Sequence, residues 1–377
     1  MTKKKKIRTE FRKNRGSRAR ASDWTKRFHT DDVREDEAVR GERISGRGEL
    51  TRKRTILVDD QATRQGDGTA VLDVQAKDCL PGRVLSVQGL ISTVQASDGQ
   101  LYQCATRRLL KTLSTDQRHV VAAGDRVLFR TSPGNEGIIE RVDTRHGVLS
   151  RATRGRQHVL VANVDQLLIV GSAAEPYLKP NLIDRFLVSA AKNKIRPLIV
   201  INKVDLIDLA TLEPLVGVYS QMGYQVMLVS ARTGAGIERL RRAVVGCTSA
   251  VAGQSGVGKS SLLNAIEPGL ALRVAAVSEE TQKGKHTTTT ARLLPVAAGG
   301  YVIDTPGIRQ FQLWDIVPEE VAGYYRDLRP FVSKCRFPDC THTHETDCAV
   351  KDAVADGWVD ERRYESYCHL HAGEMEA

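Results

Sequence analysis

A glycine-rich segment constrains the fold of this 377-residue chain more than any other feature. The segment Gly253-Gln254-Ser255-Gly256-Val257-Gly258-Lys259-Ser260 fits the pattern GxxxxGK(S/T). It follows the apolar run 249–252 and precedes residues 261–266, whose pattern is typical of a helix. Glycines here let backbone N–H groups surround phosphates at a helix N-terminus. The sequence therefore predicts a phosphate-binding loop between a buried strand and a helix.

Each part of this loop has an expected role. Lys259 is expected to reach the β- and γ-phosphates of a nucleotide, and the Ser260 hydroxyl to ligate Mg²⁺. The residues predicted to contact the nucleotide here are Gly253, Gln254, Ser255, Gly256, Val257, Gly258, Lys259, Ser260 and Ser261.

A second phosphate-side motif, Asp304-Thr305-Pro306-Gly307, ends the apolar run 301–303. Asp304 is placed to hold Mg²⁺, directly or through water, and the Gly307 N–H to sense the γ-phosphate. Together with the phosphate-binding loop, this motif indicates a GTPase.

The segment Asn202-Lys203-Val204-Asp205 supplies the chemistry for guanine. A carboxylate such as Asp205 can accept hydrogen bonds from guanine N1 and N2, whereas adenine lacks that pair of donors. We expect Asn202 to support the base and the neighbouring loops, and the Lys203 stem to lie over the base plane. Ser230-Ala231 is expected to make a supporting contact to the guanine oxygen.

The order of these motifs is unusual. Apolar runs at 166–171, 197–201, 225–229, 249–252 and 301–303 alternate with helix-like stretches, which predicts a parallel sheet covered on both faces. The guanine motifs precede the phosphate-binding loop, whereas they come last in an ordinary GTPase. The same sheet can form after such a rearrangement, so the sequence predicts an α/β GTPase domain that is circularly permuted.

The residues that would activate water are less defined. Residues 283–290, Lys-Gly-Lys-His-Thr-Thr-Thr-Thr, lie between the two phosphate-side motifs, and Thr288 is our candidate magnesium ligand. Ile308 occupies the position after Asp304–Gly307 where many GTPases have a glutamine. His286 is the nearest candidate to position the attacking water. The alternative is that His286 contacts a partner or solvent.

The region before the GTPase domain divides into two parts. Short alternating segments at 82–87, 90–95, 101–105, 125–129 and 137–142 predict a small β-barrel, with an OB-fold as the best match. Residues 1–54 carry 19 Lys and Arg against 9 Asp and Glu, nearly the whole net charge of +11. This composition predicts a disordered basic arm that either binds nucleic-acid phosphates or only aids solubility.

Four residues of types that bind metals lie close together near the C-terminus. Cys335, Cys340, His342 and Cys348 offer three thiolates and an imidazole, a set typical of structural Zn²⁺. His344 could replace His342. A second group, Cys368, His369 and His371, is interpreted as packing or surface residues. We therefore expect a small zinc-binding helical domain.

The predicted domains are 1–70 for the arm, 71–150 for the barrel, 151–320 for the GTPase domain and 321–377 for the zinc domain. The chain has seven cysteines, no apolar run of 18 residues and no apolar secretory signal, so we expect a cytoplasmic protein. No coiled-coil heptad is present, and we expect a monomer.

From about Gly82 to the C-terminus, the motifs taken together resemble the RsgA family of small ribosomal subunit biogenesis GTPases. The resemblance rests on the order NKVD, SA, GQSGVGKSS, KGKHTTTT, DTPG and CRFPDCTHTHETDC. It implies an OB-fold, a permuted GTPase domain and a zinc domain. It also implies binding of the small ribosomal subunit and its rRNA late in assembly, GTP hydrolysis to GDP there, and release. His286 and Thr288 fall on the family's switch motif, and Ile308 matches its hydrophobic position.

Two other functions are compatible with parts of the sequence. One is an RNA-binding assembly scaffold in which GTP binding only sets the conformation. The other is a permuted ATPase, against which the Asn202–Asp205 motif argues.

Overall fold

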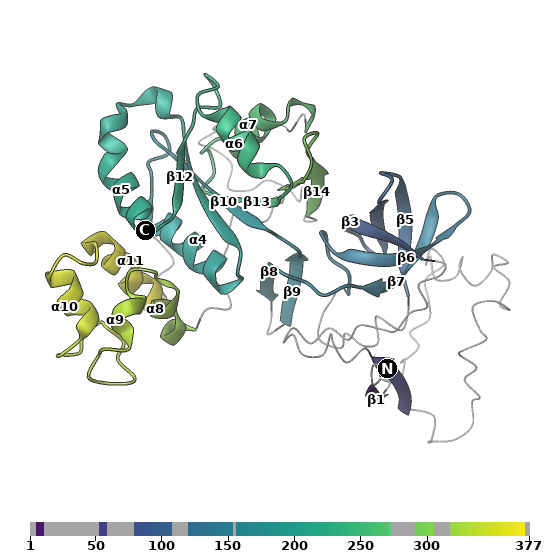
Figure 1. Ribbon diagram of the computed structural model, residues 1–377, viewed down its shortest axis with the longest axis horizontal. Helices are drawn as coiled ribbons and strands as arrows, with labels where there is room; N and C mark the ends of the chain where they lie inside the picture. The colour runs from purple at the N-terminus through teal and green to yellow at the C-terminus, as the bar shows by residue number, and fades with distance from the viewer. Residues whose placement is uncertain are drawn as a thin grey trace. The chain divides into compact units, whose positions relative to one another are not determined.

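The computed structural model describes residues 5–10, 53–58, 79–107, 120–153, 156–270, 272, 291–304 and 317–373 (Figure 1). Chain contacts divide the protein into two units, residues 1–75 with 108–115 and residues 76–107 with 116–377. The predicted site residues His286, Thr288 and Gly307 lie outside the described residues.

The first unit contains one described pair of strands. Strand β1 (Lys5–Glu10) pairs antiparallel with β2 (Lys53–Val58), with Ile7 opposite Ile56. These strands lie within residues 1–70, for which the composition predicted a disordered basic arm. The β-branched residues in both segments favour an extended backbone despite the neighbouring charges.

The second unit begins with a closed five-stranded barrel. Its strands are β3 (Leu80–Gln88), β4 (Ile91–Ala96), β5 (Leu101–Thr106), β6 (Arg126–Ser132) and β7 (Glu136–Val142). They follow the order β3-β4-β5-β7-β6 and close through the β3–β6 pairing, with β5 and β7 parallel. Alternate side chains such as Val84, Val94 and Phe129 fill the interior. The predicted OB-like barrel is therefore confirmed.

A six-stranded sheet forms the centre of the second unit. Its strands are β10 (Gln166–Ser172), β11 (Arg196–Asn202), β12 (Gln225–Leu228), β13 (Thr248–Ala252), β14 (Arg292–Pro295) and β15 (Tyr301–Asp304). They lie in the order β12-β11-β10-β13-β15-β14, and all are parallel except β14. The parallel sheet predicted from the apolar runs is confirmed. Strand β13, which leads into the phosphate-binding loop, lies between β10 and β15.

Helices cover both faces of this sheet (Figure 1). They are α4 (Pro180–Lys192), α5 (Glu213–Gln221), α6 (Ile237–Val244) and α7 (Lys259–Ile266). Successive side chains of a strand point to opposite faces. Leu167 and Ile169 of β10 accordingly pack with residues of α4 and α5, while Leu168 and Val170 pack with residues of α6 and α7. This explains why the strands are apolar at nearly every position.

Short elements connect these parts. The 3₁₀ turns η4 (Val204–Leu206), η5 (Leu209–Leu212) and η6 (Pro268–Leu270) follow β11 and α7. The hairpin β8 (Leu149–Thr153) and β9 (Arg156–Val161) lies between the barrel and β10 in sequence. The barrel is also joined to the sheet directly, because Arg292 of β14 pairs with Ser86 of β3.

The C-terminal region is a small helical cluster. It contains η8 (Pro318–Glu320), α8 (Val321–Tyr324), α9 (Arg329–Val332), α10 (Ala349–Ala355) and α11 (Glu361–His371). Tyr325, Leu328, Val350 and Tyr367 are fully buried there, and Val188 of α4 joins the same core. Among the described helices, none is both long and apolar enough to cross a membrane.

Candidate nucleotide site and metal centre

The phosphate-binding loop connects β13 to α7, as its sequence context predicted. Two of its glycines are required by close approaches of the backbone. A Cβ atom on Gly253 would lie 2.1 Å from the carbonyl oxygen of Val170, and one on Gly258 would lie 2.6 Å from Nδ2 of Asn202. Gly258 also has a positive φ of 89°. Larger residues at either position would therefore push the loop away from β10 and β11.

Lys259 is the first residue of α7. Its ammonium donates hydrogen bonds to the carbonyl oxygens of Gly253 and Gln254, at 2.9 and 2.6 Å. Its charge is thus held inside the curve of the loop. Ser260 and Ser261 follow in the first turn of α7, where helix N–H groups favour anions.

Asn202 joins three loops at the carboxyl ends of neighbouring strands. Its side chain is almost fully buried, with 2% exposed. Nδ2 donates to the carbonyl oxygen of Val257 at 2.9 Å, and Oδ1 accepts from the backbone N–H of Ala231 at 3.1 Å. One amide therefore connects the phosphate-binding loop to the segment after β12. This is the supporting position that the sequence suggested for Asn202.

Asp205 lies beside the second guanine motif. The Ser230 hydroxyl donates to Asp205 Oδ1 at 2.5 Å and accepts from the N–H of Thr233 at 3.1 Å. This hydrogen bond from Ser230 is the main cause that holds the pKa of the Asp205 carboxyl below its ordinary value. Lys203, in a left-handed conformation with φ of 64°, donates through its ammonium to the carbonyl oxygen of Glu175. Asp205 is thus a charged acceptor at neutral pH.

A cavity of about 380 Å³ lies between these motifs. Its lining comes from segments that are distant in sequence and meet at the carboxyl edge of the sheet. The lining residues are Asn202, Lys203, Asp205, Leu206, Ser230, Ala231, Arg232, Gly258 and Ser261. The volume is in the range of small-molecule sites in proteins. The structure therefore brings the predicted guanine motif, Ser230-Ala231 and the start of α7 around one space.

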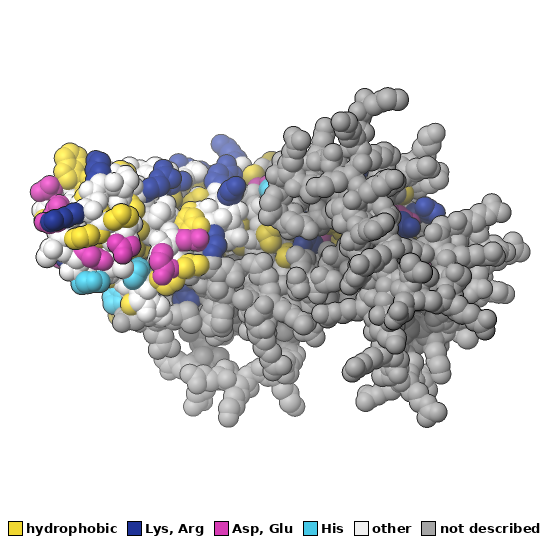
Figure 2. Space-filling model, turned by 90° about the horizontal axis from the view of Figure 1, so that it is seen from below, with side chains coloured by type: hydrophobic (Ala, Val, Ile, Leu, Met, Phe, Trp, Pro, Cys, Tyr) yellow, Lys and Arg dark blue, Asp and Glu magenta, His cyan; other side chains and the backbone are white. Residues whose placement is uncertain are grey.

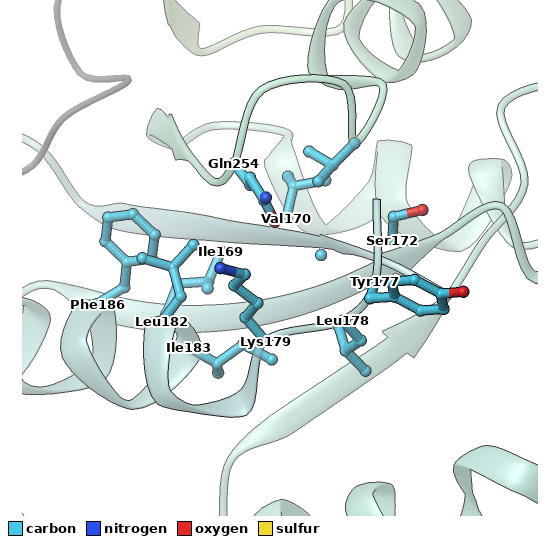
Figure 3. Close-up of a pocket in the computed structure, with 12 residues that line it drawn as sticks. Ile169, Val170, Ser172, Tyr177, Leu178, Lys179, Leu182, Ile183, Phe186 and Gln254 are labelled. Carbon is cyan, nitrogen blue, oxygen red and sulfur yellow. The ribbon is translucent and has the colours of Figure 1, made fainter. Parts of the chain in front are cut away.

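A second cavity lies on the other side of the phosphate-binding loop, between the end of β10 and the start of α4. Figure 3 shows Gln254, Ser172, Tyr177 and Lys179 around it. Its volume of about 10 Å³ is enough for about one water molecule. Gln254 was predicted to contact the nucleotide, but its side chain lines this small cavity, not the larger one.

The candidate magnesium residues are only partly described. Ser260 lies in α7, and Asp304 is the last residue of β15, which runs parallel to β13 with Ile303 opposite Ala250. Neighbouring parallel strands end at the same edge, so the backbone brings Ser260 and Asp304 to one side of the sheet. The third candidate, Thr288, lies outside the described residues, as does His286.

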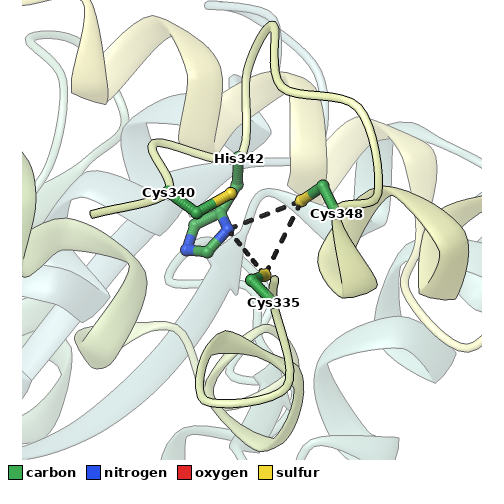
Figure 4. A group of neighbouring side chains, drawn as sticks. All are labelled: Cys335, Cys340, His342 and Cys348. Atoms are coloured by element: carbon green, nitrogen blue, oxygen red, sulfur yellow. Dashed lines mark hydrogen bonds between the residues drawn. The ribbon is translucent and has the colours of Figure 1, made fainter. Parts of the chain in front are cut away.

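The four predicted zinc ligands converge (Figure 4). One ligand atom from each of Cys335, Cys340, His342 and Cys348 lies within 4.8 Å of all the others. Nδ1 of His342 lies 3.4 Å from Sγ of Cys335 and 3.5 Å from Sγ of Cys348. Burial lowers the pKa of His342, which favours the neutral imidazole that binds metals. His344, the alternative ligand, is exposed and contacts Thr343 instead.

The chain around this cluster is held by tyrosines of α11. The Tyr364 hydroxyl donates to the carbonyl oxygen of His342 at 2.8 Å, and the Tyr367 hydroxyl to that of Thr341 at 2.6 Å. Cys368 packs partly buried against the same core, and the His371 ring lies 5.8 Å from the Tyr367 ring. Neither Cys368 nor His371 joins the ligand group found among the described residues.

Sequence reasoning missed two residues of the larger cavity, Leu206 and Arg232. Arg232 directly follows Ser230-Ala231, so its position in the motif was a usable signal. The signal for Leu206 was weaker, because a leucine directly after Asp205 in a loop has many possible roles.

Comparisons with known proteins agree with this geometry. The sequence model described as RsgA GTPase matches residues 142–314. A small ribosomal subunit biogenesis GTPase RsgA from Thermotoga petrophila is 42% identical over 293 residues, covering 77% of this chain and 95% of the relative. One of the same description from Sodalis glossinidius is 40% identical over 296 residues, covering 76% and 83%.

Two solved structures are similar to the chain over most of its length. YjeQ from Thermotoga maritima has a TM-score of 0.67 at 38% identity, covering 79% of this chain and 99% of that one. YloQ, described as a circularly permuted GTPase, has a TM-score of 0.62 at 30% identity, covering 79% and 96%.

Proposed function

Since the chain belongs to the RsgA GTPase family, we propose that it binds the small ribosomal subunit late in its maturation and hydrolyses GTP there to drive its own release. Hydrolysis of GTP is the activity of the family. The observation that supports guanine as the base is the 380 Å³ cavity, in which Asp205 offers a charged acceptor. The small subunit is the partner that the relatives' names give.

Some residues of the proposed site bind the base, and others bind the phosphates. Asp205 accepts the N1 and N2 hydrogens of guanine, and Asn202 keeps the surrounding loops together. Lys259 and the N–H groups of the phosphate-binding loop stabilise the charge that develops on the γ-phosphate during in-line attack by water. ATP would leave Asp205 unpaired, which disfavours the ATPase alternative.

Mg²⁺ and Zn²⁺ have residues that fit them. Ser260 near the start of α7 and Asp304 at the end of β15 would hold Mg²⁺ directly or through water, with Thr288 as a third candidate. Mg²⁺ would offset charge on the phosphates. Three thiols and one imidazole within 4.8 Å fit a closed tetrahedral Zn²⁺ site with a structural role.

We assign the activation of the attacking water to residues 283–290, which lie between the phosphate-binding loop and Asp304–Gly307. Ile308 follows Asp304–Gly307 and has no group that orients water, so we propose that His286 positions the attacking water. With this assignment we expect slow turnover of the isolated chain and stimulation by the ribosomal subunit, because contacts with the subunit would position His286 against the attacking water.

The proposed partner is the subunit's rRNA, contacted by a monomer in the cytoplasm. The basic surplus within residues 1–54 and the OB-like barrel support an RNA contact. Figure 2 shows basic, acidic and hydrophobic side chains intermingled on the described part of one face, so charge alone does not mark the contact there. A scaffold without catalysis is not favoured, because the relatives are named as GTPases.

The test is the hydrolysis of GTP and ATP by the full chain, with and without purified small subunits. We expect GTP-selective turnover that is slow alone and raised by small but not large subunits. Lys259→Ala should abolish turnover and leave the protein on the subunit. Equal hydrolysis of ATP, or no response to small subunits, would contradict the proposal.

A further inference from the structure

Arg232 reaches back into the larger cavity and contacts the residue that selects the base. Its Nη2 lies 2.7 Å from Oδ2 of Asp205. The arginine side chain is 72% exposed, whereas that of Asp205 is only 13% exposed. A long side chain that lies mostly in solvent thus touches a carboxylate on the cavity wall.

The two oxygens of Asp205 are used differently. Oδ1 accepts the hydrogen bond from Ser230 at 2.5 Å. Oδ2 is buried and has no aligned hydrogen bond among the described residues, although Arg232 lies at ion-pair distance. Oδ2 therefore remains available to a donor with better alignment.

The chemistry of the competing donors is closely related. Guanine presents N1–H and the N2 amino group on one carbon atom, a planar pair of N–H donors. The guanidinium of Arg232 has the same planar arrangement of nitrogens around a carbon atom and is always protonated. Both groups are suited to a carboxylate, and the guanidinium held 2.7 Å from Asp205 Oδ2 lies where the donors of guanine would bind.

We propose that Arg232 competes with guanine for Asp205, and that it thereby lowers the affinity for guanine nucleotides and speeds their release. The inference rests on the proposed guanine site. An ion pair whose arginine lies mostly in solvent is weak, so its competition corresponds to about a two- to fivefold change in Kd. Such a change adjusts nucleotide exchange and leaves base selection intact.

The test measures the binding of a fluorescent GDP analogue to the full chain and its dissociation rate. Arg232→Ala is expected to lower the Kd about two- to fivefold and to slow dissociation. Arg242→Ala is the matched control, because Arg242 is also exposed and pairs with an acid, Glu238, at 3.3 Å. Arg242→Ala removes one positive charge, as Arg232→Ala does, but from a residue that does not line the larger cavity. The Kd for the GDP analogue should therefore stay unchanged. Unchanged or weaker binding by Arg232→Ala would overturn the inference.

Two further binding experiments test whether the competition takes place at Asp205. In an Asp205→Asn background, Arg232→Ala should give no gain in affinity, since the ion pair is already lost. Raising the salt concentration from about 0.05 to about 0.5 M should narrow the gap between the parent chain and Arg232→Ala, because salt screens the pair. A gain that persists undiminished in Asp205→Asn, or a gap that salt leaves unchanged, would refute competition at this carboxylate.

Binding of GDP and ADP to the parent chain separates this inference from the proposed function. If the parent chain binds ADP as tightly as GDP, the guanine site itself is wrong. If it prefers GDP and Arg232→Ala does not tighten binding, only the competition by Arg232 is refuted.

Discussion

The guanidinium of Arg363 in α11 lies 2.5 Å from the carboxylate of Asp184 in α4, and both side chains are almost fully buried. The same guanidinium donates to both carboxylate oxygens of Asp327 at 3.0 Å and lies over the Tyr325 ring at 4.4 Å. Tyr219 of α5 donates to Asp184 at 2.7 Å. A buried charge network therefore joins the C-terminal region to the helices that cover the sheet.

Removal of Arg363 should be strongly destabilising. Arg363→Ala leaves two buried carboxylates without their cation, and we expect the free energy of unfolding to fall by about 3–5 kcal/mol. Urea denaturation of the full chain measures this change. The neighbouring Arg362 is the matched control, since it is exposed and pairs with Asp360 at 3.2 Å. Equal losses in Arg362→Ala and Arg363→Ala would show that the network adds nothing to stability.

Asn202→Ala should weaken nucleotide binding by loosening the loops around the larger cavity. The substitution leaves the carbonyl of Val257 and the N–H of Ala231 without their partner, which costs about 1–3 kcal/mol. Because both loops line the larger cavity, we expect the Kd for GDP to rise about tenfold or more.

Asn193 supplies the control for this prediction, since its amide also donates to a backbone carbonyl, that of Ser189, at 2.9 Å. It caps α4 and lines neither cavity. Titration calorimetry with GDP should separate the two variants, and equal Kd values for both would contradict the role given to Asn202.

The preference for GDP over ADP should not change with pH between about 5 and 8. The Ser230 hydroxyl, as the main cause, holds the pKa of Asp205 below its ordinary value, so the carboxylate stays charged over this range. Any stability or affinity that this charge supplies is present above the ordinary pKa of an aspartate and is lost only as pH falls through the lower folded value. The phosphates of GDP and ADP titrate alike, so their protonation cancels in the ratio of the two affinities.

Ser230→Ala removes the hydrogen bond and should move the pKa of Asp205 upward and reduce the preference for GDP. Ser220→Ala, at an exposed serine at the end of α5, should change neither. A preference that declines with a midpoint between pH 5 and 7 in the parent chain would contradict the low pKa.

Zinc removal should unfold the C-terminal region before the rest of the chain. The cluster lies within a small core whose buried residues include Cys348 and Tyr367, so a bound ion adds much of its stability. We expect about one zinc per chain by atomic absorption, and a lower melting temperature after chelation. His342→Ala should lose the metal, whereas His344→Ala should keep it. Retention of zinc by His342→Ala would disprove the ligand set.

The sequence predicted those features that depend on local patterns. Near-continuous apolar runs marked β10 and β11, and the spacing of Cys335, Cys340, His342 and Cys348 marked the cluster. Contacts between distant charged side chains were not predictable. Asp184 and Arg363 carry charges that composition places at the surface, and only the packing of α11 on α4 brings them together. The position of Arg232 after Ser230-Ala231 could have placed it near the site, but not its contact with Asp205, because the local pattern does not show which way a long side chain turns.

Arg83 joins the barrel to the strands that carry the phosphate-side motifs, and its loss should weaken that junction. From β3, its Nη2 donates to Oγ1 of Thr248 at 2.6 Å, at the start of β13, and its guanidinium lies 4.6 Å from the centre of the Tyr301 ring, at the start of β15. Arg83→Ala removes both contacts and should lower the free energy of unfolding by about 1–3 kcal/mol. Arg83→Lys keeps a cation near the ring but loses the planar guanidinium. The free energy of unfolding should therefore fall less than in Arg83→Ala.

A double-mutant cycle with Thr248→Val isolates the hydrogen bond from the ring contact. Residues in direct contact couple, so the loss in the double variant should fall short of the summed single losses by about 0.5–1.5 kcal/mol. Arg126→Ala, at an exposed position of the same barrel, should combine additively with Thr248→Val. Additive losses for Arg83 and Thr248 would mean that this hydrogen bond contributes nothing to the junction between the two parts.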